Sequence, residues 1–586
     1  MKKLQMSIWK SLNYTSIIQN SIITTLLAIW LPLPFINFDE HHDGLILSTI
    51  RLTKSALIQG GEYPFNQYGP FWIIPFVLLS LIVPNEFLFL GVRFLTVFFY
   101  IISAFLLWKI SRLLLNQKLS KIVVILFLGS QPFTTDYGSS LVPWPSAIVM
   151  PIALAITYFS LLQVVELKSK HQISMFPVYV GFLLPSIILT RLQVGIVLVV
   201  AAVISMYFSE VKFKYIKLLT GFVVSTSLMV IYLIQFGWLK DAFYDQIIFG
   251  STYLSSDKST FPKPIFTFIG IMIFFMILLS GQTVIDKILI NRPKVMLLVI
   301  AFAIFISSTL VFYLIYSRNI SPLAALVVMT RRFWITSSLS VNLFLSTKII
   351  RSEIKNWQGY NSLARIPNSI KLLLLFTLSL QIQVYPLFDQ MHFWWGSPLT
   401  FLVMVIVIKD NFRTTSAKVK DKLSLTALGI FLLMFAVLVP WTAQLTSQKE
   451  KLPNEIGQHI YSSSQNAQYQ KSLQNFFHQN IPKGSTVLNI CDNTNIFFES
   501  DQYVTANRIF VFWGEQMSHA PGMYRSFLDS NPEFILTCGL THAPKLRLEQ
   551  EKMQRLILEK MVGKFEDPIS YSDIPNKIWD IYKVSK

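Results

Sequence analysis

The stretch SIITTLLAIWLPLPFINFDEHHDGLILS, residues 21–48, passes abruptly from an apolar run into a cluster of ionisable side chains. Residues 21–35 carry no charge, and three acids and two histidines fill positions 39–43. An apolar run of about 20 residues is typical of a helix that crosses the hydrocarbon core of a membrane. The ionisable cluster is therefore expected to lie at the membrane surface, directly after the first span.

The composition of the whole chain agrees with a membrane protein. Of 586 residues, 53% are hydrophobic and 14% are charged, and the mean hydropathy is +0.51. Soluble domains carry about 25% charged residues. No A-x-A-like cleavage site follows the first apolar run, so we interpret it as a retained span and not as a signal peptide. The thirteen predicted spans are 17–36, 87–108, 121–135, 143–165, 174–190, 192–208, 216–236, 264–285, 295–316, 325–347, 370–386, 394–409 and 424–443.

The segment FWIIPFVLLSLIVP, residues 71–84, is not counted as a span. It has only 14 residues and contains two prolines, which is more typical of an interfacial or re-entrant helix. We therefore expect one long outer loop, 37–86, between the first two spans. Within it, apolar residues at helical spacing predict a short helix along the membrane over 46–57.

The distribution of charge predicts the orientation. Residues 444–586 hold 15 basic and 15 acidic residues, so the net charge of +19 belongs to residues 1–443. With the N-terminus inside, 25 of the 35 Lys and Arg in this part fall in cytoplasmic loops, seven fall outside and three fall within spans. This bias is the positive-inside pattern. It indicates membrane topology and no nucleic-acid partner, and it places the C-terminus outside.

Residues 1–443 are thus predicted to form the transmembrane domain, and 444–586 a small extracytoplasmic α/β domain. STVLNIC (485–491) and EFILTC (533–538) are typical of buried strands, and QYQKSLQNFFHQN (468–480) of an amphipathic helix. Cys491 and Cys538 each close one strand. An oxidising exterior would permit a disulfide between them, and two small buried residues at strand ends are the alternative.

Two acid–histidine clusters are predicted on the outer face. Asp39, His42 and Asp43 share one face of a helical turn, and Asp389 and His392 repeat the three-residue spacing. Carboxylate and imidazole groups can act as general bases or bind a divalent metal. The alternative interpretation is that these are solvated loop charges at the membrane interface.

With these motifs the chain resembles the GT-C superfamily of integral-membrane glycosyltransferases. HDGLILSTIRLTKSALIQGGEYPFNQYGPF (42–71) is similar to their first outer loop, and YPLFDQMHFWWGSP (385–398) to a late loop with Asp and His. A basic residue often precedes that Asp in the family, but Phe388 stands here. The small C-terminal α/β domain is similar to that of bacterial relatives.

The resemblance implies that a sugar passes from a polyprenyl-phosphate carrier to an acceptor hydroxyl on the outer face, usually with inversion. The enzyme would be a hexosyl- or pentosyltransferase of the bacterial cytoplasmic membrane, with an envelope glycan, lipid or protein as acceptor. Asp43, before Gly44, would be the catalytic base, with Asp39 or Glu40 as rivals. Asp136 occupies the place of a second acid from the second outer loop.

Further residues would contact the substrate or a metal. If Mg²⁺ or Mn²⁺ is required, its candidate ligands are Asp43, Asp136 and His392. Arg191 lies between two spans at their outer end and suits a phosphate, or it extends to the outer headgroups. Arg331 and Arg332 suggest a polar cavity within the membrane, or an error in the predicted span. The remaining candidates for substrate binding are His42, Tyr68, Asp389 and His392.

Two other functions stay open at the level of sequence. A transporter or flippase for a lipid carrier or polysaccharide would need ionisable residues near the bilayer midplane and a repeat between the two halves. The sequence shows no repeat, and its acids gather at the outer surface. A non-catalytic envelope assembly protein whose C-terminal domain binds a partner is the second alternative.

Overall fold

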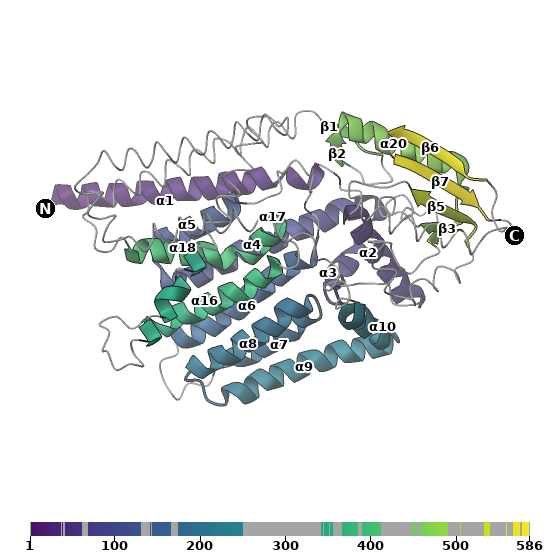
Figure 1. The fold of residues 1–586 in the computed structure, drawn as a ribbon. Coiled ribbons are helices and arrows are strands. Elements are labelled where there is room, and N and C mark those ends of the chain that lie inside the picture. Colours follow the sequence, from purple (N-terminus) through teal and green to yellow (C-terminus); the bar gives the residue numbers. More distant parts are fainter. Residues whose placement is uncertain are drawn as a thin grey trace.

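The computed structural model describes residues 2–36, 38, 42–60, 68–130, 141, 143–165, 174–249, 341–343, 345–350, 352–354, 366–384, 390–411, 449–453, 459–489, 504–505, 532–538, 558, 567–574 and 577–584. Long apolar helices dominate this part of the chain (Figure 1). The longer ones are α1 (Lys2–Trp30), α2 (His42–Gln59), α4 (Asn85–Leu114), α5 (Gln117–Gly129), α6 (Pro145–Val165), α7 (Phe176–Ile188), α8 (Leu192–Phe208), α9 (Lys214–Gln235), α16 (Asn368–Gln381) and α18 (Pro398–Asn411). The shorter ones are η1 (Leu33–Phe35), α3 (Ile74–Ser80), α10 (Leu239–Phe243), η2 (Tyr244–Phe249), η3 (Ile382–Val384) and α17 (Gln390–Gly396).

Several of these helices can cross a membrane. Four segments are long and apolar enough by length and composition: Ser16–Phe35, Asn85–Leu114, Pro145–Val165 and Lys214–Gln235. Four shorter apolar helices accompany them, namely α7, α8, α16 and the first part of α18. The chain is therefore a multi-pass membrane protein.

The observed helices fall close to the predicted spans where both can be compared. α4, α6 and α8 match 87–108, 143–165 and 192–208, with α4 longer at both ends. The segment predicted at 121–135 is helical only to Gly129 within the described residues. The predicted spans 264–285, 295–316 and 424–443 lie outside the described residues, and so does most of 325–347.

In the predicted first outer loop, 37–86, the described residues form the helices α2 and α3. α2 covers the helix expected over 46–57 and extends it at both ends. Gly60, at φ +74°, follows its last residue, and glycine readily adopts this left-handed conformation. α3 has seven residues within the segment 71–84 and rises about 10 Å, far less than the hydrocarbon core of about 30 Å. This segment therefore does not cross the membrane as a continuous helix.

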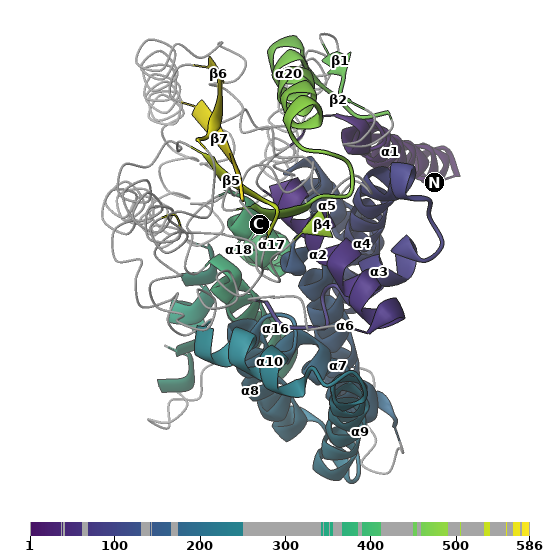
Figure 2. The ribbon, with the colours of Figure 1, turned by 90° about the vertical axis from the view of Figure 1, so that its right-hand side faces the viewer.

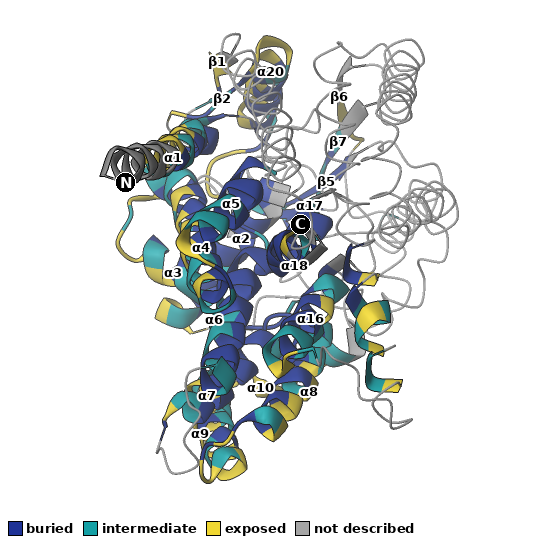
Figure 3. Cartoon of the chain, turned by 90° about the vertical axis from the view of Figure 1, so that its left-hand side faces the viewer, coloured by how far each residue is buried: buried dark blue, intermediate teal, exposed yellow. Residues whose placement is uncertain are grey.

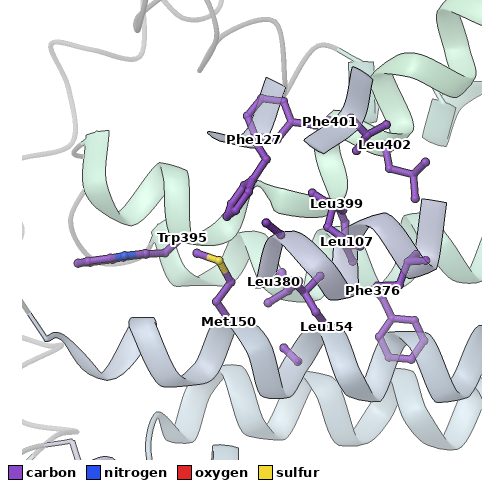
Figure 4. Packing of buried hydrophobic residues seen from close by; sticks show 14 of the residues in the cluster. Leu107, Phe127, Met150, Leu154, Phe376, Leu380, Trp395, Leu399, Phe401 and Leu402 are labelled. Carbon is purple, nitrogen blue, oxygen red and sulfur yellow. The ribbon is translucent and has the colours of Figure 1, made fainter. Parts of the chain in front are cut away.

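The core lies where α4, α5 and α6 meet α16, α17 and α18. Figure 4 shows Leu107, Met150, Phe376, Trp395 and Leu399 interdigitating at this junction. Outer faces of the helices are exposed instead (Figure 3). On α9, for example, Leu219, Leu228 and Ile231 are each more than half exposed. In a membrane such a face contacts lipid chains, where an exposed apolar side chain costs nothing.

The described residues of the C-terminal part form helix α20 (Ser464–Asn480) and two small sheets. In the larger sheet the strand order is β4-β3-β5-β7-β6. β3 is parallel to β4 and β5, whereas β7 is antiparallel to β5 and β6. The strands are β1 (Lys449–Lys451), β2 (Tyr461–Ser463), β3 (Thr486–Asn489), β4 (Val504–Thr505), β5 (Phe534–Cys538), β6 (Ile569–Ile574) and β7 (Lys577–Lys583).

This arrangement contains the elements expected in the C-terminal region. β3 and β5 lie within the two predicted strands, and α20 includes the predicted amphipathic helix. Cys538 ends β5, whereas Cys491 lies outside the described residues. Figures 1 and 2 show the larger sheet at the end of the molecule that carries α2 and α3, away from the N-terminus.

Candidate active site near the start of α4

Asp43 is held by a buried arginine. It is the second residue of α2, and its Oδ2 accepts a hydrogen bond from Arg93 Nη2 at 2.8 Å. The Asp43 side chain is 1% exposed and that of Arg93 is 0% exposed. A buried arginine next to a carboxylate favours the ionised form of that carboxylate. The interpretation of Asp43 as a solvated loop charge is therefore excluded.

Arg93 also fixes the chain that leads into α2. Its Nη1 donates to the carbonyl oxygens of Pro34 and Ile36, at 2.9 and 3.2 Å. Its guanidinium lies over the ring of Phe89, 4.2 Å from the ring centre. One side chain of α4 thus contacts the end of the first apolar segment, the connection after it and the start of α2.

Sequence reasoning did not assign Arg93 to the site, although a signal was present. An arginine nine residues into an apolar helix is costly in a membrane unless it has a buried partner. The sequence contains that signal but does not say which of the 31 acidic residues is the partner. The pairing with Asp43, 50 residues away, is a product of tertiary structure.

The late motif packs on the same face of α4. His392 lies on α17, partly buried, with its ring 5.1 Å from that of Trp395 in an edge-on contact. Trp395 Nε1 donates to the hydroxyl of Tyr100 at 2.9 Å. Tyr100 and Arg93 are seven residues apart on α4, which is two turns or about 10 Å along the axis. The helix therefore supports both predicted motifs at neighbouring positions.

Arg191 is buried between α7 and α8. It is 7% exposed and immediately precedes α8, and its Nη1 donates to Ser146 Oγ at 2.6 Å. An arginine in this position does not extend to the outer headgroups, so that alternative is excluded. The residue lies instead at an internal junction of three helices.

The end of the first outer loop reaches the same junction. The Tyr68 ring is 5.6 Å from that of Trp144, two residues before the serine that Arg191 contacts. Phe71 N donates to the carbonyl oxygen of Leu189 at 3.1 Å, two residues before Arg191. The structure thus brings together two predicted substrate-binding residues, Tyr68 and Arg191, around the start of α6.

Gly69 makes this close approach possible. It has φ +90°, and a Cβ at this position would lie 2.4 Å from Leu189 O and 2.7 Å from Gln246 Cδ. Gln246 in turn donates from Nε2 to the carbonyl oxygen of Ile188. Only glycine fits both the conformation and the space.

The substitution Gly69→Ala should displace the loop from the α7–α8 turn, since the backbone oxygen of Leu189 cannot yield as a flexible side chain could. We expect a loss of about 1–3 kcal/mol in the free energy of unfolding, measured in detergent micelles. Gly60→Ala is the matched control, because Gly60 also has positive φ but has no atom within 4 Å of the place that a Cβ would take. Equal losses in both variants would show that conformation alone, and not the contact with Leu189, requires Gly69.

The remaining candidates of the sequence analysis are mostly outside the described part of the chain. Asp39, Glu40, Asp136 and Asp389 lie outside the described residues, as do Arg331 and Arg332. His42 begins α2, but only its backbone is described. Within the described residues, no group of three His, Cys, Asp or Glu side chains could hold a metal ion. Arg93 already supplies a positive charge at Asp43, so the described residues do not fit a divalent cation there. No step of the reaction proposed below uses a metal.

Neither a family model nor a curated protein matches this sequence. Among solved structures, the chain is similar to the Archaeoglobus fulgidus oligosaccharyltransferase complexed with Zn and sulfate (10% identity, 96% of this chain and 73% of that one, TM-score 0.43). It is also similar to ArnT from Cupriavidus metallidurans bound to undecaprenyl phosphate (12% identity, 96% and 97%, TM-score 0.40). At these identities and TM-scores, the likenesses say nothing about activity, which has to be inferred from the chain's own residues.

Proposed function

We propose that the protein is a glycosyltransferase that moves a sugar from a polyprenyl-phosphate carrier to an envelope acceptor on the outer face of the membrane. The observation that carries the proposal is the buried pair of Asp43 and Arg93 at the start of the first outer loop. A transporter would instead need its ionisable residues near the bilayer midplane. Asp43 instead follows the first apolar segment, in the predicted outer loop, where a carrier lipid would present its sugar.

Asp43 acts as general base in this proposal. As the acceptor oxygen bonds to the anomeric carbon, its proton passes to the Asp43 carboxylate, and the bond from that carbon to the phosphate oxygen breaks. The polyprenyl phosphate leaves from the opposite face, so the configuration inverts. The Arg93 guanidinium, 2.8 Å from Oδ2, stabilises the ionised form of this carboxylate. Asp39 and Glu40 are the rivals for this role.

The departing phosphate needs a cation, and Arg191 is the candidate. A guanidinium can donate two parallel hydrogen bonds to phosphate oxygens. Tyr68, whose ring packs on Trp144 two residues before Ser146, lies in the same predicted outer loop as Asp43, so donor and base would be held by one loop. His42, His392, Asp136 and Asp389 are the further candidates for contact with the sugar or acceptor.

The orientation proposed is N-terminus inside and C-terminus outside, in a bacterial cytoplasmic membrane. The 25-to-7 division of basic residues supports it, and the two termini lie at opposite ends of the molecule (Figure 1). Reporter fusions after Gln117 and after Thr446 should report inside and outside respectively. The same side for both would contradict the orientation.

The envelope glycans of a deletion strain test the function itself. Mass spectrometry should find one glycan that lacks a sugar residue, and the intact gene should restore it. A glycan profile identical to that of the parent strain would contradict the proposal. If a gene that carries Asp43→Asn restores the glycan, Asp43 is not the base, but the protein is still a transferase.

A further inference from the structure

The connection between α1 and α2 is held from two sides. Arg93 of α4 contacts it through the carbonyl oxygens of Pro34 and Ile36. On the other side, the backbone at Ile36 forms a parallel β-bridge with Tyr461, the first residue of β2. Ile36 therefore lies between the transmembrane helices and the C-terminal region.

Side chains extend this contact. His459 stacks on Phe87 at the start of α4, with ring centres 6.2 Å apart and ring planes 19° apart. One continuous cluster of buried apolar residues includes Phe38 and Ile46 near the acid cluster, and Leu452 and Ile460 beside β2. The C-terminal region is thus packed on the first outer loop rather than tethered to it.

We infer that the C-terminal domain positions the first outer loop, and with it Asp43, through the pairing of Tyr461 with Ile36. The inference rests on the proposed function of Asp43. Ile36 is seven residues before Asp43, and Arg93 contacts both. Fixing Ile36 from the side opposite Arg93 limits how far Asp43, seven residues later, can shift. The docked arrangement is then the active one, and undocking lowers turnover without removing any group that touches the substrate.

A disulfide tests the geometry first. Ile36→Cys is combined with Tyr461→Cys in a protein that carries Cys491→Ser and Cys538→Ser. Paired strands lie about 4.8 Å apart, within the Cα range of about 4.4–6.8 Å that a disulfide spans. We expect a near-complete intramolecular disulfide on mild oxidation, and none in either single variant. No cross-link in the double variant would overturn the inference.

Turnover tests the role. Phe87→Ala with His459→Ala should weaken docking and lower kcat at least tenfold with little change in the KM for the donor. Adding the engineered disulfide should restore kcat, because the covalent bond replaces the lost contacts. If the disulfide forms but abolishes turnover, the domain must move away from the loop during the reaction. If kcat is unchanged in the Phe87 and His459 variant, docking of the domain does not contribute to turnover. Either result would overturn the inference.

Hydrogen exchange separates this inference from the proposed function. Amides of α2 should exchange faster in the Phe87 and His459 variant and return to the original rate with the disulfide. If the protein transfers no sugar at all, the proposed function fails while these exchange rates still decide whether the domain positions the loop. Unchanged exchange in α2 would overturn the positioning role whatever the activity.

Discussion

Replacing Asp43 with Asn is expected to lower turnover by about 100- to 10,000-fold, the usual contribution of a general base. Asn retains the size and hydrogen-bonding capacity of Asp but cannot accept the proton of the acceptor hydroxyl. Donor binding should change little, because Asp43 acts on the acceptor. The measurement is kcat and KM of purified protein, corrected for the folded fraction.

Two matched variants make that result specific. Glu86→Gln removes an exposed acid at the start of α4, at the same end of the helix as Arg93, and should leave turnover close to the original. Asp39→Asn should have a smaller effect than Asp43→Asn. Near-normal turnover by Asp43→Asn would transfer the role of base to Asp39 or Glu40 and leave Asp43 as an anchor for Arg93.

Arg93→Gln is expected to be the most destabilising single substitution in the site. It leaves the Asp43 carboxylate buried without its cation and also removes the donors to Pro34 O and Ile36 O. Removing one partner of a buried ion pair costs about 3–5 kcal/mol. The free energy of unfolding can be measured by denaturant titration in mixed micelles. Arg112→Gln, an exposed arginine on the same helix, should change it by less than about 0.5 kcal/mol.

The double variant Asp43→Asn with Arg93→Gln shows whether the two charges act as a pair. With neither charge present, no uncompensated ion remains buried, so the loss should be clearly smaller than the sum of the single losses. Strictly additive losses would mean that the two side chains are not energetically coupled, and that Arg93 acts only through the carbonyl oxygens.

The first outer loop shows which structural features could be predicted from the sequence and which could not. Its apolar spacing predicted the helix α2, and the length of 71–84 argued against a span, because both depend on local periodicity and length. The partner of Asp43 could not be predicted, since any of the arginines near an outer boundary would have satisfied the same local rule. The proximity of Tyr68 to Arg191 depends equally on how α6, α7 and α8 pack.

Burial was the second property that the sequence could not supply. Acids and histidines after an apolar span are compatible with a solvated loop, and Asp43 is distinguished from that case by its 1% exposure and its ion pair with Arg93. The late motif is similar. The hydrogen bond from Trp395 to Tyr100, 295 residues away, sets α17 against α4, and nothing in residues 385–398 alone indicates that partner.

The most direct test of the central claim is the transfer reaction with purified protein. Lipid-linked sugars extracted from the deletion strain, where an unused donor should accumulate, are incubated with the protein and envelope acceptor. Mass spectrometry then follows the donor, free polyprenyl phosphate and glycosylated acceptor. The proposal predicts that the intact protein releases polyprenyl phosphate and glycosylates the acceptor, while Asp43→Asn does so at least 100 times more slowly. An intact protein that consumes no polyprenyl-linked sugar would contradict the account.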